Sequence, residues 1–121
     1  MNEKIMVVDD SALSRRTLRR ILETAGYRVV EAEEGMTALE LYFVEKPDLV
    51  FLDLVMKGMD GLDVLAKLRE MDAGARVIVA SADIQRSTRA MVEEGGASAF
   101  INKPFGAENV LGAVTSVLGG K

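Results

Sequence analysis

Five short apolar runs recur along the chain, and each is followed by a longer segment in which apolar residues are spaced three or four positions apart. A short apolar run with polar residues at its ends is typical of a strand buried on both faces, as in a parallel sheet covered by helices. The pattern therefore predicts strands at residues 4–8, 27–32, 49–52, 76–80 and 99–102.

The segments between these runs are expected to be helices because their apolar residues fall on one face. Ser11 is suited to cap the first helix, and Gly26 to end it at a positive φ. The second helix is expected to begin at Gly35 and to end before Pro47. The other three are expected through Leu62, Leu65 and Leu68, from about Ile84 to Glu94, and through Val110, Leu111, Val114, Val117 and Leu118.

Strands that alternate with helices build an α/β sandwich, with helices on both faces of a parallel sheet. We predict a flavodoxin-like, doubly wound (βα)5 fold with right-handed crossovers and the strand order 2-1-3-4-5. The first and third strands are neighbours in that order. A chain of 121 residues can bury a core of its own, so a single domain is expected over residues 1–121.

The composition excludes several kinds of chemistry. The chain has no cysteine and no histidine, which rules out disulfides, thiolate or imidazole metal sites and histidine-based catalysis. Its net charge of −4 gives no footprint for nucleic acid, and no apolar run approaches the ~20 residues that span a bilayer. We expect a cytoplasmic protein without direct nucleic-acid binding or membrane insertion, whose chemistry uses carboxylates, hydroxyls and lysine.

Polar residues suited to chemistry follow the first, third, fourth and fifth predicted strands. They are Asp9 and Asp10, Asp53, Ser81 and Lys103. Taken singly, each fits an ordinary role in a helix cap, a turn or a loop. Because the carboxyl ends of parallel strands meet at one edge, where ligands bind in open α/β sheets, the fold predicts that these side chains share one crevice.

Carboxylates gathered at one edge favour a divalent cation. Two of them ~4 Å apart repel each other by roughly 4 kcal/mol, and a single lysine cannot neutralise three. Oxygen ligands without histidine or cysteine suit Mg²⁺. A carboxylate can also accept a phosphoryl group, a reaction that needs mainly positioning and charge neutralisation. The residues thus indicate a Mg²⁺ site in which Asp53 is a candidate phosphoryl acceptor and Ser81 a hydroxyl donor.

Four strings of residues resemble the receiver domain of two-component response regulators. They are Val7-Val8-Asp9-Asp10-Ser11, Asp53-Leu54-Val55-Met56 followed by Met59-Asp60-Gly61, Ser81-Ala82, and Ala99-Phe100-Ile101-Asn102-Lys103-Pro104-Phe105. The resemblance implies that Asp53 accepts a phosphoryl group from a histidine kinase. It also implies that Asp10, Asp53 and the main-chain carbonyl of Val55 hold Mg²⁺, with Asp9 acting through a bound water.

By the same resemblance, Lys103 pairs with the phosphoryl oxygens, and Ser81 moves inward to bond them. Phe100 occupies an aromatic switch position and turns from exposed to buried, and the bond between Lys103 and Pro104 is cis. A downstream protein is expected on the surface of the fourth helix, fifth strand and fifth helix, with candidate contacts at Met91, Val92 and Phe105.

Three features depart from the commonest pattern of this family. Lys57 stands where a proline is usual, and Phe100 lacks the hydroxyl of the tyrosine often found at its position. Val55 and Asp83 occupy the two positions that tune the lifetime of the phosphoryl group in the family. The resemblance implies that this lifetime is set at the same two positions here.

The leading interpretation is a phosphorylation-controlled switch, expected to be a monomer and not a turnover enzyme. The string from Asp9 to Leu13 resembles chemotaxis-type receivers, and the chain stops where its fifth helix ends, so we expect a stand-alone regulator of that type. A phosphorelay intermediate and a receiver fragment of a longer regulator are alternatives. A small aspartate-nucleophile phosphatase or a flavin carrier is an alternative of another class, although Asp9 and Asp10 stand where a flavin carrier needs a phosphate-binding loop.

Overall fold

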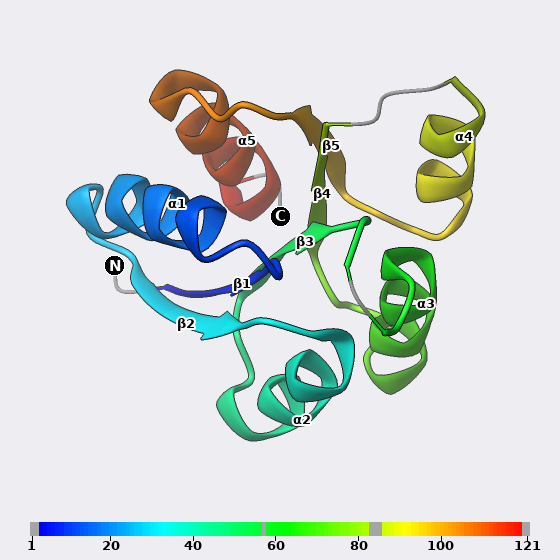
Figure 1. The fold of residues 1–121 in the computed structure, drawn as a ribbon. Coiled ribbons are helices and arrows are strands. Elements are labelled where there is room, and N and C mark those ends of the chain that lie inside the picture. The colour runs from blue at the N-terminus through cyan, green and yellow to red at the C-terminus, as the bar shows by residue number, and fades with distance from the viewer. Residues whose placement is uncertain (1–2, 57, 83–85, 120–121) are drawn as a thin grey trace.

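Five parallel strands form one sheet at the centre of the computed structural model, in the order β2-β1-β3-β4-β5 (Figure 1). The structure describes residues 3–56, 58–82 and 86–119. The strands are β1 (Lys4–Val8), β2 (Arg28–Ala32), β3 (Leu49–Asp53), β4 (Val77–Ser81) and β5 (Ala99–Asn102). The helices are α1 (Ala12–Thr24), α2 (Gly35–Glu45), α3 (Gly61–Met71), α4 (Arg86–Glu94) and α5 (Ala107–Gly119).

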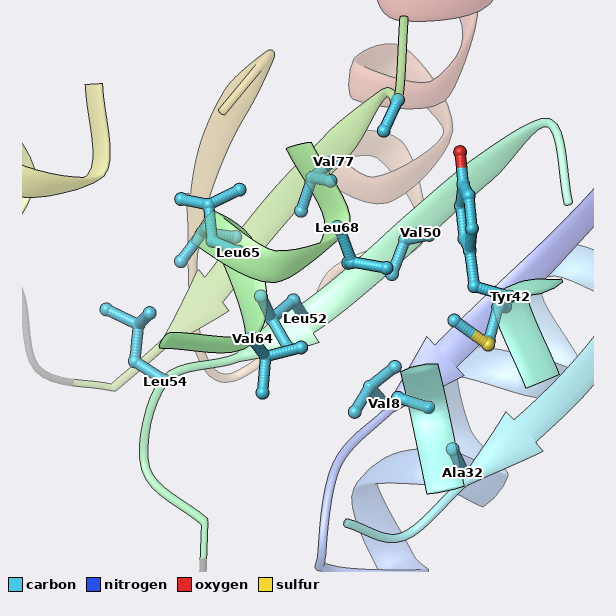
Figure 2. Packing of buried hydrophobic residues seen from close by; sticks show 14 of the residues in the cluster. Val8, Ala32, Tyr42, Val50, Leu52, Leu54, Val64, Leu65, Leu68 and Val77 are labelled. Carbon is cyan, nitrogen blue, oxygen red and sulfur yellow. The ribbon is translucent and has the colours of Figure 1, made fainter. Parts of the chain in front are cut away.

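Alternate residues of the central strands face opposite layers of helices, because successive side chains of a strand point to opposite faces. One face packs against α1 and α5 in a cluster that includes Ile5, Val7, Phe51, Leu22 and Val114. The other face packs against α2, α3 and α4 in a cluster that includes Met6, Val8, Leu52, Leu65 and Val92 (Figures 1 and 2). Each such side chain contributes roughly 1.5–3 kcal/mol by its burial. The sheet is therefore a firmly packed platform for the residues at its edge.

The predicted fold class and strand order are confirmed. Where an observed strand boundary differs from the predicted one, it differs by a single residue. The second strand begins at Arg28 rather than one residue earlier, and the fourth runs from Val77 to Ser81. The fourth helix is described from Arg86, so its expected start at Ile84 lies outside the described residues.

The helix ends follow the local rules. The Ser11 hydroxyl accepts a hydrogen bond from the Ser14 amide at 3.2 Å, and Gly26 has the positive φ of +99° expected after the first helix. The second helix ends at Glu45, before Pro47. These caps define where the helices begin and end. Because the strands are parallel, their carboxyl ends all lie at one edge of the sheet.

The prediction for Val92 was wrong. Its side chain is 1% exposed and belongs to the cluster between the sheet and α2, α3 and α4, because it lies on the sheet-facing side of α4. Met91 is 46% exposed, and Phe105 is partly buried against the α1 and α5 cluster. Met91 therefore remains the exposed apolar residue of the expected partner surface. None of the helices among the described residues is long and apolar enough to cross a bilayer.

Candidate functional site

Three carboxylates meet where β1 and β3 end. The two strands pair in parallel with Val8 opposite Leu52, so the residues that follow, Asp9 and Asp53, lie side by side. One carboxylate oxygen from each of Asp9, Asp10 and Asp53 lies within 4.8 Å of the others. The predicted gathering of these acids at one edge is thus confirmed.

Lys103 brings a cation to the same edge from β5. Its Nζ lies 2.8 Å from Oδ2 of Asp9 and 3.4 Å from Oδ2 of Asp53. The Lys103 amide donates to the Ser81 carbonyl at 3.1 Å, which fixes the start of this loop beside the end of β4. The bond between Lys103 and Pro104 is cis, as the family resemblance implied.

The two buried acids differ in how firmly they are held. Asp9 is 4% exposed, and its carboxylate accepts hydrogen bonds from the Ser11 amide at 2.9 Å and from Lys103. Asp53 is 6% exposed, and its Oδ1 accepts a long bond of 3.4 Å from the Val55 amide. Asp10 is exposed. Asp53 therefore combines burial with the more loosely held carboxylate oxygens.

The charges of this cluster shift the ionisation of its members. Burial and, after it, the charge of Asp9 raise the pKa of Asp53, and the nearby Lys103 offsets only part of this effect. Burial alone would disfavour the Lys103 ammonium, but its hydrogen bond to Asp9 and the charge of Asp53 outweigh burial and raise the pKa of Lys103. Among the described residues, Lys103 is the cation that contacts this group of three acids, so the acids outnumber the cation.

The backbone at Asp9 is positioned by an arginine that the sequence analysis did not single out. Nη1 of Arg15 donates to the Asp9 carbonyl at 2.6 Å, and its Nε contacts Oε1 of Glu31 at 3.0 Å. The Asp9 amide donates to Ala32 at 3.1 Å. An arginine in the first turn of a helix gives no sequence signal for such a contact, because most arginines there are solvated. Arg15 and β2 together fix the loop that carries Asp9.

Ser81, the predicted hydroxyl donor, lies at the same edge, while Phe100, the predicted aromatic switch residue, lies within β5 at the side of the sheet. Asp53 pairs with Ala80 in the β3–β4 register, so Ser81 lies one residue beyond that pair, and it is 0% exposed. Phe100 pairs with Val79 and packs, partly buried, against the cluster beneath α2, α3 and α4. Cζ of Arg89 lies 5.5 Å from the centroid of its ring.

The loop residues expected to tune the site are only partly described. Val55 is 67% exposed, and its aliphatic side chain offers no polar group to the carboxylates. Lys57 and Asp83 lie outside the described residues.

The donor set fits a hard divalent cation. All of the candidate side-chain ligands are carboxylate oxygens, and they are close enough to share one ion. Mg²⁺ prefers oxygen ligands, takes only one or two carboxylates directly and keeps several waters. Excess negative charge beside a buried carboxylate is what such an ion would relieve. The site can therefore hold a divalent cation next to a carboxylate nucleophile.

Comparison with known proteins assigns this arrangement to a family. The model of the response regulator receiver domain matches residues 5–115. The chain belongs to the response regulator receiver domain family. This receiver domain is 42% identical over 119 residues to the chemotaxis protein CheY of Bacillus subtilis, which covers 98% of this chain and 99% of that protein.

Two further relatives frame the receiver domain. It is 36% identical to the sporulation initiation phosphotransferase F of Bacillus subtilis, over 98% of this chain and 95% of that protein. Its fold matches a chain of the CheX–CheY–BeF3–Mg²⁺ complex from Borrelia burgdorferi with a TM-score of 0.92 and 33% identity, and the match covers 95% of this chain and 88% of that chain. The receiver domain is thus a two-component regulator, and the phosphatase and flavin-carrier alternatives lose their support.

Proposed function

We propose that Asp53 of this receiver domain accepts a phosphoryl group from a histidine kinase in a Mg²⁺-dependent reaction, and that this modification switches the binding of a partner protein. The observation that carries the proposal is the convergence of Asp9, Asp10, Asp53 and Lys103 at one sheet edge. Phosphoryl transfer needs positioned charges more than covalent assistance from the protein, and this cluster supplies them.

Asp53 is the acid best suited to act as nucleophile. Both oxygens of Asp9 already accept short hydrogen bonds, from the Ser11 amide and from Lys103. The contacts of Asp53 are longer, at 3.4 Å to the Val55 amide and 3.4 Å to Lys103. An ionised carboxylate needs no general base, so an Asp53 oxygen can attack phosphorus as the bond to the donor imidazole breaks.

The metal ligands proposed are Asp10, Asp53 and the main-chain carbonyl of Val55, with Asp9 acting through a water. When bound, Mg²⁺ would neutralise the charge that accumulates between these carboxylates and the phosphoryl oxygens. Lys103 already lies between Asp9 and Asp53, so its ammonium is placed to contact a phosphoryl oxygen on Asp53.

The switch is proposed to run from Ser81 to Phe100. The buried Ser81 hydroxyl lies one residue beyond the strand pair of Asp53, where it can bond a phosphoryl oxygen. Two charge-assisted hydrogen bonds, from Ser81 and Lys103, would contribute roughly 3–6 kcal/mol to the conformation that makes them. That is enough to invert a two-state population, and Phe100 would bury further in the favoured state.

The phosphodonor must approach the edge that carries Asp53. A groove of about 350 Å³ opens beside it, lined by Leu13, Ser14, Thr17, Ala82, Lys103, Pro104 and Phe105. Leu13 is 69% exposed and gives this groove an apolar contact for a kinase. The downstream partner is proposed to bind the face of α4, β5 and α5, where Met91 is exposed. The CheY relatives support a chemotaxis-type role. The proposal includes action in the cytoplasm and a switch rather than a turnover enzyme.

Intact-mass analysis after incubation with acetyl phosphate and Mg²⁺ tests the proposal. We expect one added phosphoryl group on the wild type, none on Asp53→Asn, and none when EDTA removes the metal. Asp63→Asn, which alters an exposed acid on α3, is the matched control and should be labelled like the wild type. Labelling of Asp53→Asn, or labelling that ignores EDTA, would contradict the assignment.

A further inference from the structure

Helix α2 is apolar on its outer face as well as on the face that it buries. Ala38 and Tyr42 face the core, yet the exposed fractions are 57% for Met36, 73% for Phe43 and 71% for Val44. A surface helix normally presents polar residues to water. Glu40 is the charged residue in the middle of this outer face, and it is flanked by large apolar side chains. The helix therefore presents an unpartnered apolar surface.

A groove continues this surface past the end of α2. It has a volume of about 460 Å³ and is lined by Tyr42, Phe43, Lys46, Pro47, Met71 and Asp72. Its wall is fixed by a hydrogen bond of 2.8 Å that Oη of Tyr42 donates to Oδ2 of Asp72, which ties α2 to the end of α3. Tyr42 also belongs to the buried cluster between the sheet and α2, α3 and α4 (Figure 2). The groove is thus a largely apolar depression whose shape is held by the Tyr42–Asp72 hydrogen bond.

The charges beside the groove are arranged symmetrically about Phe43. Glu40 lies three residues before Phe43 within α2, and Lys46, the left-handed cap residue that follows the helix, lies three residues after Phe43. Both are exposed, and the structure gives neither of them an ion pair among residues 3–56, 58–82 and 86–119. If a second α2 lay antiparallel across the first with the two-fold axis at Phe43, each Glu40 would face the other Lys46. In that arrangement the two charges would be complementary across the two-fold axis.

We propose that α2 is a self-association surface, on which a second copy of the chain packs its own α2 antiparallel about a two-fold axis at Phe43. The two Phe43 rings stack at the centre, and Glu40 pairs with Lys46 of the second copy twice. Met36 lies about 10 Å before Phe43 along the helix, so it reaches beyond Lys46 of the second copy into the groove. Such an isologous contact closes at a dimer.

The size of the contact predicts a weak dimer. Two short helices with their grooves bury an area at the low end of specific interfaces, below ~1,200 Å² in total. Association should therefore depend on concentration. The centre of the contact lies away from the phosphoryl site, because Lys46 and Pro47 precede β3 whereas Asp53 ends it, roughly 16 Å away along the strand. Met36 lies at the other end of α2, towards the edge that carries Asp53.

Sedimentation equilibrium over a range of protein concentrations tests the proposal. We expect a monomer–dimer equilibrium for the wild type, a dissociation constant at least tenfold weaker for Phe43→Ser, and an unchanged one for Met91→Ser. Met91 is the matched control because it is an exposed apolar residue on α4. A wild type that stays monomeric, growth beyond a dimer, or equal weakening by Met91→Ser would each overturn the proposal.

A charge swap tests the antiparallel register itself. Glu40→Lys and Lys46→Glu should each weaken self-association, because like charges then face each other across the two-fold axis. An equimolar mixture of these two variants should form a heterodimer, and the double variant should regain the wild-type dissociation constant. Labelling by acetyl phosphate shows that each variant is folded. A mixture that associates no better than its components would overturn the register, and with it the proposal.

Discussion

The Lys103 ammonium lies 2.8 Å from Oδ2 of Asp9, although 94 positions separate the two residues in the chain. In the strand order of the sheet, this contact crosses from the end of β5 to the end of β1, over the ends of β4 and β3. The pair therefore connects the two sides of the edge at which Asp53 lies.

Replacing Lys103 by methionine should destabilise the metal-free protein at pH 7 by roughly 2 kcal/mol. The change leaves Asp9 and Asp53 without their cation, and the cost is below that of a fully buried pair because the Lys103 side chain keeps 18% of its exposure. Burial and the charge of Asp9 already raise the pKa of Asp53, so lowering the pH protonates Asp53 and reduces the loss of stability that the substitution causes. Urea denaturation at pH 7 and at pH 4.5 measures both effects.

The control for this experiment is Lys67→Met, which removes an exposed lysine from α3. It should change the free energy of unfolding by less than ~0.5 kcal/mol at either pH. Equal losses for the two variants would mean that Lys103 does not stabilise the carboxylates.

Asp53→Asn should raise the melting temperature of the metal-free protein at pH 7. Burial and the charge of Asp9 raise the pKa of Asp53 in the folded state, so its ionised form costs stability at every pH above that value. The gain should vanish at a pH below the ordinary pKa of an aspartate, where the wild-type side chain is protonated in both folded and unfolded states. Calorimetry across this pH range would refute the argument if the wild type melted higher at pH 7.

Mg²⁺ should stabilise the wild type, and Asp10→Asn should lose most of that effect. A cation at ten times its dissociation constant adds about 1.4 kcal/mol to the free energy of unfolding. Without metal, Asp10→Asn should melt above the wild type, because one of three mutually repelling carboxylates is gone. Thermal melts with and without Mg²⁺ decide both points, with Asp63→Asn as the variant that should behave like the wild type.

Gly61→Ala should destabilise the protein by roughly 1–3 kcal/mol and impair labelling of Asp53. A Cβ at Gly61 would lie 2.4 Å from Cα of Leu54 and 2.8 Å from the carbonyl oxygen of Asp53, so backbone at the site would have to move. Gly112→Ala is the matched control, since nothing lies within 4 Å of its Cβ in α5, and it should stabilise by about 0.5–1 kcal/mol. Unfolding curves that rank these variants the other way would contradict the packing at α3.

Phe100→Trp should report the proposed switch by fluorescence. The chain has no tryptophan, so the introduced indole is the sole one. Adding acetyl phosphate and Mg²⁺ should shift its emission to shorter wavelength as the ring leaves solvent. The same substitution combined with Asp53→Asn should show no shift. An unchanged spectrum in a protein that mass analysis shows to be phosphorylated would exclude Phe100 as the moving residue.

The strands and the acid cluster were predictable because both follow from local pattern and one topological rule. The apolar run from Leu49 to Leu52 ends at Asp53, and the strand order then places Asp9 beside it. Neither step needs knowledge of side-chain contacts.

The partners of individual side chains were not predictable in the same way. Lys103 contacts Asp9 more closely than Asp53, and Arg15 bonds the Asp9 carbonyl, because both choices depend on how loops from distant strands meet. Val92 was placed on the wrong side of its helix because Met91 and Val92 are adjacent apolar residues, and the sequence alone did not tell which of them faces the sheet. The exposed apolar face of α2 was not predictable for a related reason. Apolar residues lie on most sides of this helix, so the sequence does not mark which side faces the solvent.

The connection between Asp9 and Lys103 also has a consequence for biosynthesis. A nascent chain that has not yet released Lys103 from the ribosome already contains Asp9, Asp10 and Asp53 but lacks the lysine that contacts two of them. Vectorial synthesis thus delivers the lysine after the acids that it contacts. The site cannot become complete before the residues from β1 to Lys103 have all emerged.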